Sequence, residues 1–297
     1  MNSLRIATLL AWLAIGLSAF SPARSQVLSV GGKDFTEQLL VAEMTSQYLR
    51  AKGYGVRTRT GFSSIGIRRE QEAGLVDVYW EYTGTSLISF NGVTDKLGPK
   101  EAYEKVKQLD ARKGLVWLRP SDVDNTYALA MRKADAEAKG ISSISDLAAK
   151  VRQGETFRLA CNIEFYIRTD GLLPLERAYG FEFGPENVVR MATGSIYDVL
   201  RDSPEIQVGL VFATDGRVAA DDFLILRDDR GFFPSYLLTP VVRQRALEQN
   251  PELAGHLEAL SAKLDNSTMA KLNRMVDVDK RTVGEVATFF LQESGLL

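Results

Sequence analysis

The sequence predicts an α/β protein of two lobes, each built on a sheet flanked by helices. Short apolar runs alternate along the chain with longer segments of helical periodicity, a pattern typical of α/β layers with mainly parallel strands. About 270 residues follow an N-terminal leader, which is enough for two modest domains. Two strand-like segments, 126–131 and 223–226, resemble crossings between two sets of βα units.

The leader, residues 1–25, has the features of a signal peptide. Arg5 supplies a positive charge, residues 7–20 are almost uninterruptedly apolar, and Ala23-Arg24-Ser25 offers small residues for cleavage. The apolar run is shorter than the roughly 20 residues that a membrane-spanning helix needs. No cysteine lies near the cleavage site to carry a lipid. We therefore expect a periplasmic protein that starts near Gln26 and is not a lipoprotein.

Composition disfavours several classes of protein. The formal charge of −2 becomes −4 without Arg5 and Arg24, so there is no basic excess to attract nucleic acid. Cys161 is the only cysteine, which rules out an internal disulfide. The sequence has no cluster of metal ligands and no Walker-type phosphate loop, so we expect neither a metal nor another cofactor. The only histidine, His256, lies in a charged helical stretch and is a poor candidate for nucleophilic catalysis.

The first part of the mature chain predicts alternating strands and helices. Gly31-Gly32-Lys33 is typical of a turn, and Asp34 with Glu37 is typical of a capping box that opens a helix. The expected strands are 27–30, 56–60, 76–82 and 115–118, and the expected helices are 34–49, 67–73 and 99–112.

The second part repeats the alternation after the segment 126–131. Ser143 and Asp146 have the spacing of a helix N-terminus, and Pro174 indicates the start of a regular helix. Further strands are expected at 157–160, 188–191, 208–212 and 223–226, a helix at 196–200, and a helical tail over 240–297. We expect lobe 1 to comprise 26–124 and 229–297, lobe 2 to comprise 125–228, and a ligand cleft to lie between them.

The most informative segment is Asp77–Thr85, which reads DVYWEYTGT. It places three aromatic rings and two threonine hydroxyls on a short strand and its exit turn, where side chains are well placed to line a cleft. Together with Gly31–Gln38, which reads GGKDFTEQ, it resembles the substrate-binding proteins of osmoprotectant ABC importers. Those proteins bind glycine betaine, choline and related betaines. The resemblance covers nearly all of the mature chain.

This resemblance implies an aromatic cage. A quaternary ammonium has no N–H donor, so ring faces must hold it, each contributing roughly 0.5–2 kcal/mol. By position, Tyr82, Tyr127 and Tyr236 fall on cage tyrosines of the family. Phe212 stands where the family usually has tyrosine, and it keeps a π-face without the hydroxyl.

The resemblance also implies a polar end of the site for a ligand carboxylate. Arg168 resembles the family's carboxylate-binding arginine, because a guanidinium can grip a carboxylate with two N–H groups. Thr85 resembles a hydroxyl donor of the family, and Lys33 lies close to a helix N-terminus that favours anions. Tyr197 is a further candidate at the border of the cleft. Trp80 is in phase with Tyr82, and we interpret it as a core anchor.

The function implied is that of a monomeric periplasmic binding protein, not an enzyme, which delivers its ligand to an inner-membrane permease and its ATPase. The role would be osmoprotection or nutrient uptake. Phe212 leaves open another small zwitterion or an amino acid as ligand, and a sensor that signals to a membrane receptor is a further alternative. A secreted enzyme using Asp77 with Glu81, or Glu164 with Asp170, is disfavoured because nothing in the sequence fixes the geometry of either pair.

Overall fold

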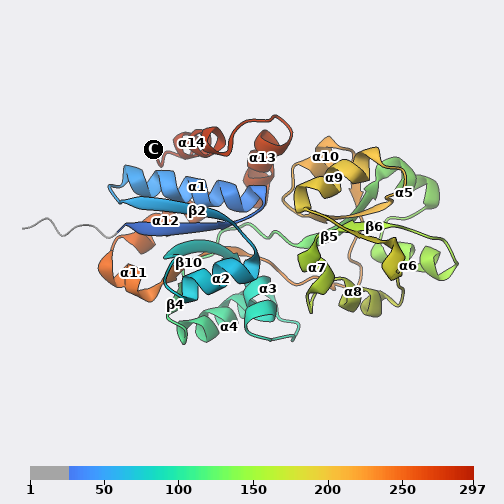
Figure 1. Cartoon of the computed structure of the whole chain (residues 1–297), viewed down its shortest axis with the longest axis horizontal. Coiled ribbons are helices and arrows are strands. Elements are labelled where there is room, and N and C mark those ends of the chain that lie inside the picture. Colours follow the sequence, from blue (N-terminus) through green and yellow to red (C-terminus); the bar gives the residue numbers. More distant parts are fainter. Residues whose placement is uncertain (1–26) are drawn as a thin grey trace, which may run out of the picture.

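The computed structural model describes residues 27–297, and the expected signal peptide, residues 1–25, lies outside them. Figure 1 shows two lobes side by side, each with a central sheet flanked by helices. We call the lobe that contains the first strand lobe 1 and the other one lobe 2. The two-lobed α/β architecture expected from the sequence is therefore confirmed.

The sheet of lobe 1 has the strand order β2-β1-β3-β10-β4. Strands β1, β2 and β3 are parallel, and β10 runs antiparallel between β3 and β4. Because β10 follows the residues of lobe 2 in the sequence, lobe 1 consists of two segments of the chain, one before lobe 2 and one after it. The strands are β1 (Leu28–Lys33), β2 (Val56–Phe62), β3 (Val78–Tyr82), β4 (Leu115–Trp117) and β10 (Leu238–Arg243).

The sheet of lobe 2 has the order β7-β6-β8-β5-β9. Strands β6, β7 and β8 are parallel, whereas β5 is antiparallel to both β8 and β9. Four strands of each sheet therefore run in the same direction, as expected, and the fifth, β10 in lobe 1 and β5 in lobe 2, runs against them because it arrives from a connection between the lobes. The strands are β5 (Tyr127–Arg132), β6 (Leu159–Cys161), β7 (Val188–Arg190), β8 (Val208–Phe212) and β9 (Phe223–Ile225).

Helices cover both sheets, and α1 packs against α13 and α14 over lobe 1 (Figure 1). The helices of lobe 1 are α1 (Thr36–Ala51), α2 (Ser64–Glu72), α3 (Thr83–Thr85), a π-helical turn (Ser86–Phe90), α4 (Pro99–Ala111), α11 (Gln244–Gln249), α12 (Leu253–Ser261), α13 (Asn266–Asp277) and α14 (Val283–Glu293). Those of lobe 2 are α5 (Lys133–Lys139), α6 (Ile144–Arg152), α7 (Ile163–Ile167), α8 (Leu172–Tyr179), a 3₁₀ turn (Pro185–Asn187), α9 (Thr193–Asp202) and α10 (Arg217–Ala220).

Two expectations for the first βα unit are wrong. Residues Gly31-Gly32-Lys33 continue β1 instead of turning, and a Cβ at Gly31 would lie 2.9 Å from the side chain of Ile67. These glycines therefore serve close packing and not a turn. The capping box is also absent: Phe35 is the N-cap of α1 and makes no side-chain cap bond, while Glu37 points into the interior.

The expected helical tail is interrupted by a strand. Leu238, Val241 and Val242 are fully buried in β10 between β3 and β4. Pro240 lies inside this strand, and proline normally argues against a central strand, which is why the sequence pattern missed it. In lobe 2, α6 begins after Ser143 with the capping box that was expected, but α8 begins at Leu172 and not at Pro174.

Two connections join the lobes. The chain crosses once before β5 and returns after β9, so the segment 223–226 belongs to the lobe 2 sheet and the return follows it. Asp124 on the first connection pairs antiparallel with Leu237 on the second, and the Asn125 N–H donates to the Tyr236 carbonyl at 3.2 Å. The connections thus lie side by side. The exact lobe boundaries given above stay a prediction.

Two buried polar contacts brace the core of lobe 1. Trp80 is fully buried and its Nε1–H donates to Thr45 Oγ1 at 2.8 Å, as expected of a core anchor. Arg68 and Asp110 form a buried ion pair with a 2.6 Å Nη2–Oδ1 distance, which ties α2 to α4. This lobe is therefore a firm support for the residues at its cleft edge.

Candidate functional site

Five aromatic rings lie between the lobes. Tyr82 ends β3 and Phe35 follows β1, so both come from lobe 1. Tyr127 and Phe212 are register partners on β5 and β8 of lobe 2. Tyr236 lies on the returning connection, two residues before β10. The rings gather there because strand ends from both sheets face the cleft.

Neighbouring rings are in contact, and we call these five residues the ring chain. The ring centroids are 6.3 Å apart for Tyr82 and Phe35, and 5.8 Å apart for Phe35 and Phe212. They are 5.2 Å apart for Phe212 and Tyr127, and 5.4 Å apart for Tyr127 and Tyr236. Phe35 and Phe212 stack at an interplanar angle of 7° and so join lobe 1 to lobe 2. The structure thus brings together Tyr82, Tyr127, Phe212 and Tyr236.

Lys33 lies at the lobe 1 end of the ring chain. Its Nζ is 4.9 Å from the centroid of the Tyr82 ring and 2.6 Å from Glu81 Oε1. Glu81 also accepts from the Tyr79 hydroxyl at 3.1 Å and from the Tyr82 N–H at 2.7 Å. The charge of Lys33 is therefore balanced by a buried carboxylate of its own lobe.

Arg168 lies at the other end, between α7 and α8. Its guanidinium is 5.6 Å from the centroid of the Tyr127 ring and 5.8 Å from that of the Tyr236 ring. Two of its nitrogens donate to Asp170: Nε to Oδ1 at 2.7 Å and Nη2 to Oδ2 at 2.5 Å. Its Nη1 reaches across the cleft to Thr85 Oγ1 of lobe 1 at 3.4 Å. The sequence-predicted Arg168 and Thr85 are thus brought together, but Asp170 already holds one edge of the guanidinium.

Glu37 joins both lobes through its buried carboxylate. It accepts from the Tyr82 hydroxyl at 2.7 Å and from Asn125 Nδ2 at 2.9 Å on the first connection. It also accepts from Thr214 Oγ1 of lobe 2 at 2.5 Å and from Asn273 Nδ2 at 3.4 Å. Burial raises the pKa of the Glu37 carboxyl above its ordinary value, against the opposing effect of these donors. Glu37 thereby fixes the Tyr82 ring and contacts lobe 2 in the same cluster.

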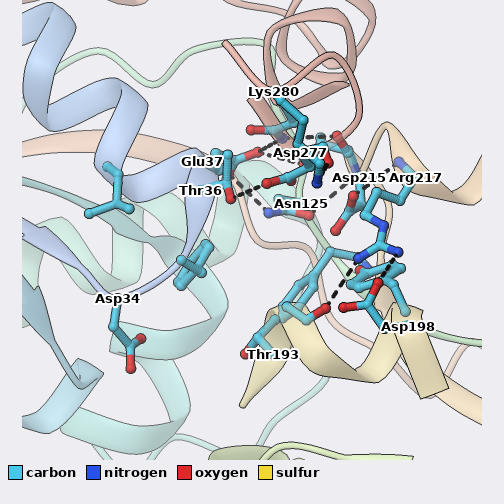
Figure 2. Close-up of a pocket in the computed structure, with 17 residues that line it drawn as sticks. Asp34, Thr36, Glu37, Asn125, Thr193, Asp198, Asp215, Arg217, Asp277 and Lys280 are labelled. Atoms are coloured by element: carbon cyan, nitrogen blue, oxygen red, sulfur yellow. Dashed lines mark hydrogen bonds and ion pairs between the residues drawn. The ribbon is translucent and has the colours of Figure 1, made fainter. Parts of the chain in front are cut away.

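A cavity of about 340 Å³ opens beside Phe35 and Phe212. Figure 2 shows its carboxylates on both sides, with Asp277 near Glu37, Asp215 near Arg217, and Asp34 set apart. Burial raises the pKa of Asp215 to about 6, and it also raises the pKa of Asp277. The cleft next to the ring chain is therefore rich in carboxylates.

Tyr197, the remaining candidate, lines this cavity but is itself buried. Its hydroxyl accepts from the Phe212 N–H at 3.3 Å, and the Arg217 guanidinium lies 5.2 Å from its ring centroid. Tyr197 therefore supports the backbone at Phe212.

Sequence reasoning missed three residues of this site. Phe35 and Glu37 both lie in the GGKDFTEQ segment, where the helix-start pattern was read as local capping. From the sequence, Asp170 stands only as half of a disfavoured acid pair with Glu164, whereas in the structure it is buried and contacts both Arg168 and Tyr236. A signal was available in the Arg-x-Asp spacing, which places the two charges within reach of each other.

Three further features of residues 27–297 concern metal binding, membrane crossing and the single histidine. Within residues 27–297, no three His, Cys, Asp or Glu side chains are grouped so as to hold a metal ion. None of the helices in that range combines the length and the apolar character that crossing a bilayer requires. His256 packs between the rings of Tyr48 and Tyr54 in lobe 1, at 5.9 Å from each centroid.

Two α/β lobes joined by two neighbouring connections are the architecture of the type II class of periplasmic substrate-binding proteins, and this chain has it. The comparisons place the chain more narrowly. Residues 26–293 match the model of the substrate-binding domain of ABC-type glycine betaine transport systems, and the chain belongs to that family. This family consists of transporter binding proteins and not of enzymes, and its substrate-binding proteins are periplasmic.

Relatives and solved structures agree with this assignment. The chain is 40% identical to the glycine-betaine-binding protein of Pseudomonas aeruginosa, over 95% of this chain and 92% of the relative. It is 32% identical to the glycine betaine-binding protein YehZ of Escherichia coli, over 97% and 95%. The crystal structure of a glycine betaine/carnitine/choline ABC transporter protein matches with a TM-score of 0.72 and 26% identity, covering 91% of this chain and 99% of that one.

Proposed function

We propose that this protein captures a quaternary ammonium osmoprotectant, glycine betaine, choline or a related betaine, between its lobes for import by an ABC transporter. The ring chain is the observation that carries the proposal. It presents π-faces from both lobes, and two of the protein's own cations, Lys33 and Arg168, already lie over rings at its two ends. Faces that attract these cations suit a cation that lacks N–H donors.

The cage in this proposal consists of Tyr82, Tyr127, Phe212 and Tyr236, joined by Phe35. For a ligand with a carboxylate, the polar end consists of Arg168 Nη1 and the Thr85 hydroxyl, which lie 3.4 Å apart across the cleft. Lys33 contributes positive charge, and Glu81 accepts from one of its three ammonium N–H groups. Tyr197 acts from behind Phe212.

The ligand favours a closed form in which both lobes touch it. That form docks as a monomer on an inner-membrane permease coupled to an ATPase. Export through a cleaved signal peptide, without a lipid anchor, delivers the protein to the periplasm. The family and the relatives named for glycine betaine support the proposed role in an ABC transporter.

Calorimetric titration of the mature protein, freed of ligand by partial unfolding, tests the proposal with glycine betaine and choline. We expect saturable binding that weakens about tenfold or more in Tyr82→Ala, Tyr236→Ala and Phe35→Leu, since each loses one ring contact or more. Phe289→Leu, which changes a ring on α14 that lies beside Lys271 and Arg281, serves as the control. If neither ligand gives a heat of binding at millimolar concentration, the proposal is wrong.

A further inference from the structure

The surroundings of Arg168 bear on which ligands the site prefers. The guanidinium is buried, and its faces lie against the rings of Tyr127 and Tyr236. Its Nε–Nη2 edge, the edge best shaped for a two-point grip on a carboxylate, is taken by Asp170 at 2.7 and 2.5 Å. Nη1 makes no bond to Asp170 and lies 3.4 Å from Thr85 Oγ1 across the cleft and 3.5 Å from Glu164 Oε1.

Asp170 is held firmly in this position. Its Oδ2 also accepts from the Tyr236 hydroxyl at 2.6 Å, so its carboxylate links Arg168 to the ring chain. The following residue, Gly171, admits no side chain, because an added Cβ would lie 1.9 Å from the Phe165 carbonyl oxygen. A turn packed this tightly gives Asp170 little freedom to swing away when a ligand arrives.

We propose that Asp170 is a specificity-determining residue that blocks the Nε–Nη2 edge of Arg168 and so limits the preference for carboxylate-bearing ligands over carboxylate-free cations. The inference rests on the proposed function, since it concerns the same site. A betaine carboxylate meets one nitrogen of the guanidinium instead of two. Choline has no carboxylate and loses nothing by this arrangement.

The ratio of the affinities for glycine betaine and choline measures this effect. In Asp170→Asn the edge is no longer held by a charged partner, and we expect the ratio to rise about tenfold, the value of one additional charge-assisted contact. The substitution also weakens the hydrogen bond that residue 170 accepts from the Tyr236 hydroxyl. This change affects the binding of both ligands, so it cancels in the ratio of their affinities.

Glu164→Gln is the matched control. It removes another negative charge near the same guanidinium, at 3.5 Å from Nη1, on a partly exposed side chain that does not grip the Nε–Nη2 edge. We expect the ratio to change less than about threefold in this variant. An equal rise in both variants, or no rise in Asp170→Asn while both ligands still bind, would overturn the inference and leave the proposed function intact.

If Asp170→Asn does not fold, Arg168→Lys tests the inference instead, because lysine keeps a positive charge opposite Asp170. With one-point contact in the native protein, the ratio falls less than about threefold. A fall of more than about tenfold means that the native guanidinium grips the ligand with two nitrogens despite Asp170, and it overturns the inference. A native protein that binds neither ligand overturns the inference and the proposed function together.

Discussion

Phe212 shows at the residue scale what the loss of one hydroxyl means. Its ring stacks on Phe35 of lobe 1 and touches Tyr127 of lobe 2, and neither contact needs a hydroxyl. In the proposed cage, phenylalanine still supplies a π-face and a bridge between the lobes. Its backbone N–H is held by the Tyr197 hydroxyl, so its position is set from behind.

Single residues also show which parts of the candidate site the sequence predicted. The three tyrosines, Arg168 and Thr85 come from a resemblance of ordered positions, and the structure brings them together. The partners that set their electrostatics were not predictable in this way. Glu81 lies beside Lys33 because β3 and β1 are neighbours in the sheet. Asp170 is close to Arg168 in the sequence, but its burial is set by the fold, and a charged residue in a sequence is most often solvated.

Asp215 gives a prediction about pH. Its pKa of about 6 lies above the ordinary 3.8, so the folded protein binds a proton that the unfolded chain releases. The free energy of unfolding should therefore fall as pH rises from about 4 to about 6, by about 2 kcal/mol from this group. Urea unfolding of Asp215→Asn should show a flatter pH dependence than the native protein, with Asp198→Asn, at an exposed position, as control. Identical slopes would contradict the assignment.

At the scale of elements, the sequence predicted most strands and helices of the βα units but missed β10. Alternating apolar runs are local and readable, whereas β10 gains its place from partners more than 100 residues away. Pro240 and the helical pattern of the residues that follow made the strand pattern of β10 hard to recognise in the sequence. In the same way, β1 extends to Lys33 because its glycines pack against α1 and α2, a cause that local turn rules do not contain.

The central place of β10 predicts its contribution to stability. Val241 is fully buried between β3 and β4, so Val241→Ala should lower the free energy of unfolding by about 2 kcal/mol. Val27→Ala, at a side chain 53% exposed, should change it by less than about 0.5 kcal/mol. Urea unfolding of both variants measures the difference. A cost at Val241 no larger than that at Val27 would mean that β10 is not a core strand.

At the scale of the whole molecule, the lobes meet through a small set of side chains. The Phe35–Phe212 stack, the Thr85–Arg168 contact and the Glu37 cluster each join lobe 1 to lobe 2. A binding protein of this class works by changing the angle between its lobes, so such contacts set how readily the closed form is populated without ligand.

Glu37→Gln tests this coupling. The substitution keeps the shape but replaces one acceptor oxygen by a donor that faces the groups now donating to Glu37. We expect a larger radius of gyration of the ligand-free variant in small-angle X-ray scattering, and about tenfold weaker ligand binding. Glu248→Gln, at an exposed site of lobe 1, should change neither quantity. An unaltered radius together with unaltered affinity would show that the Glu37 cluster does not hold the lobes.

Replacing the charge of the ligand tests the central claim most directly. Choline and 3,3-dimethylbutan-1-ol have the same shape, but a neutral tert-butyl group replaces the trimethylammonium. If the ring chain holds a cation, calorimetry of the native protein should show choline binding at least about thirtyfold more tightly than the neutral alcohol, because only choline gains cation–π attraction. Equal affinities, or tighter binding of the alcohol, would mean that the rings offer only an apolar surface.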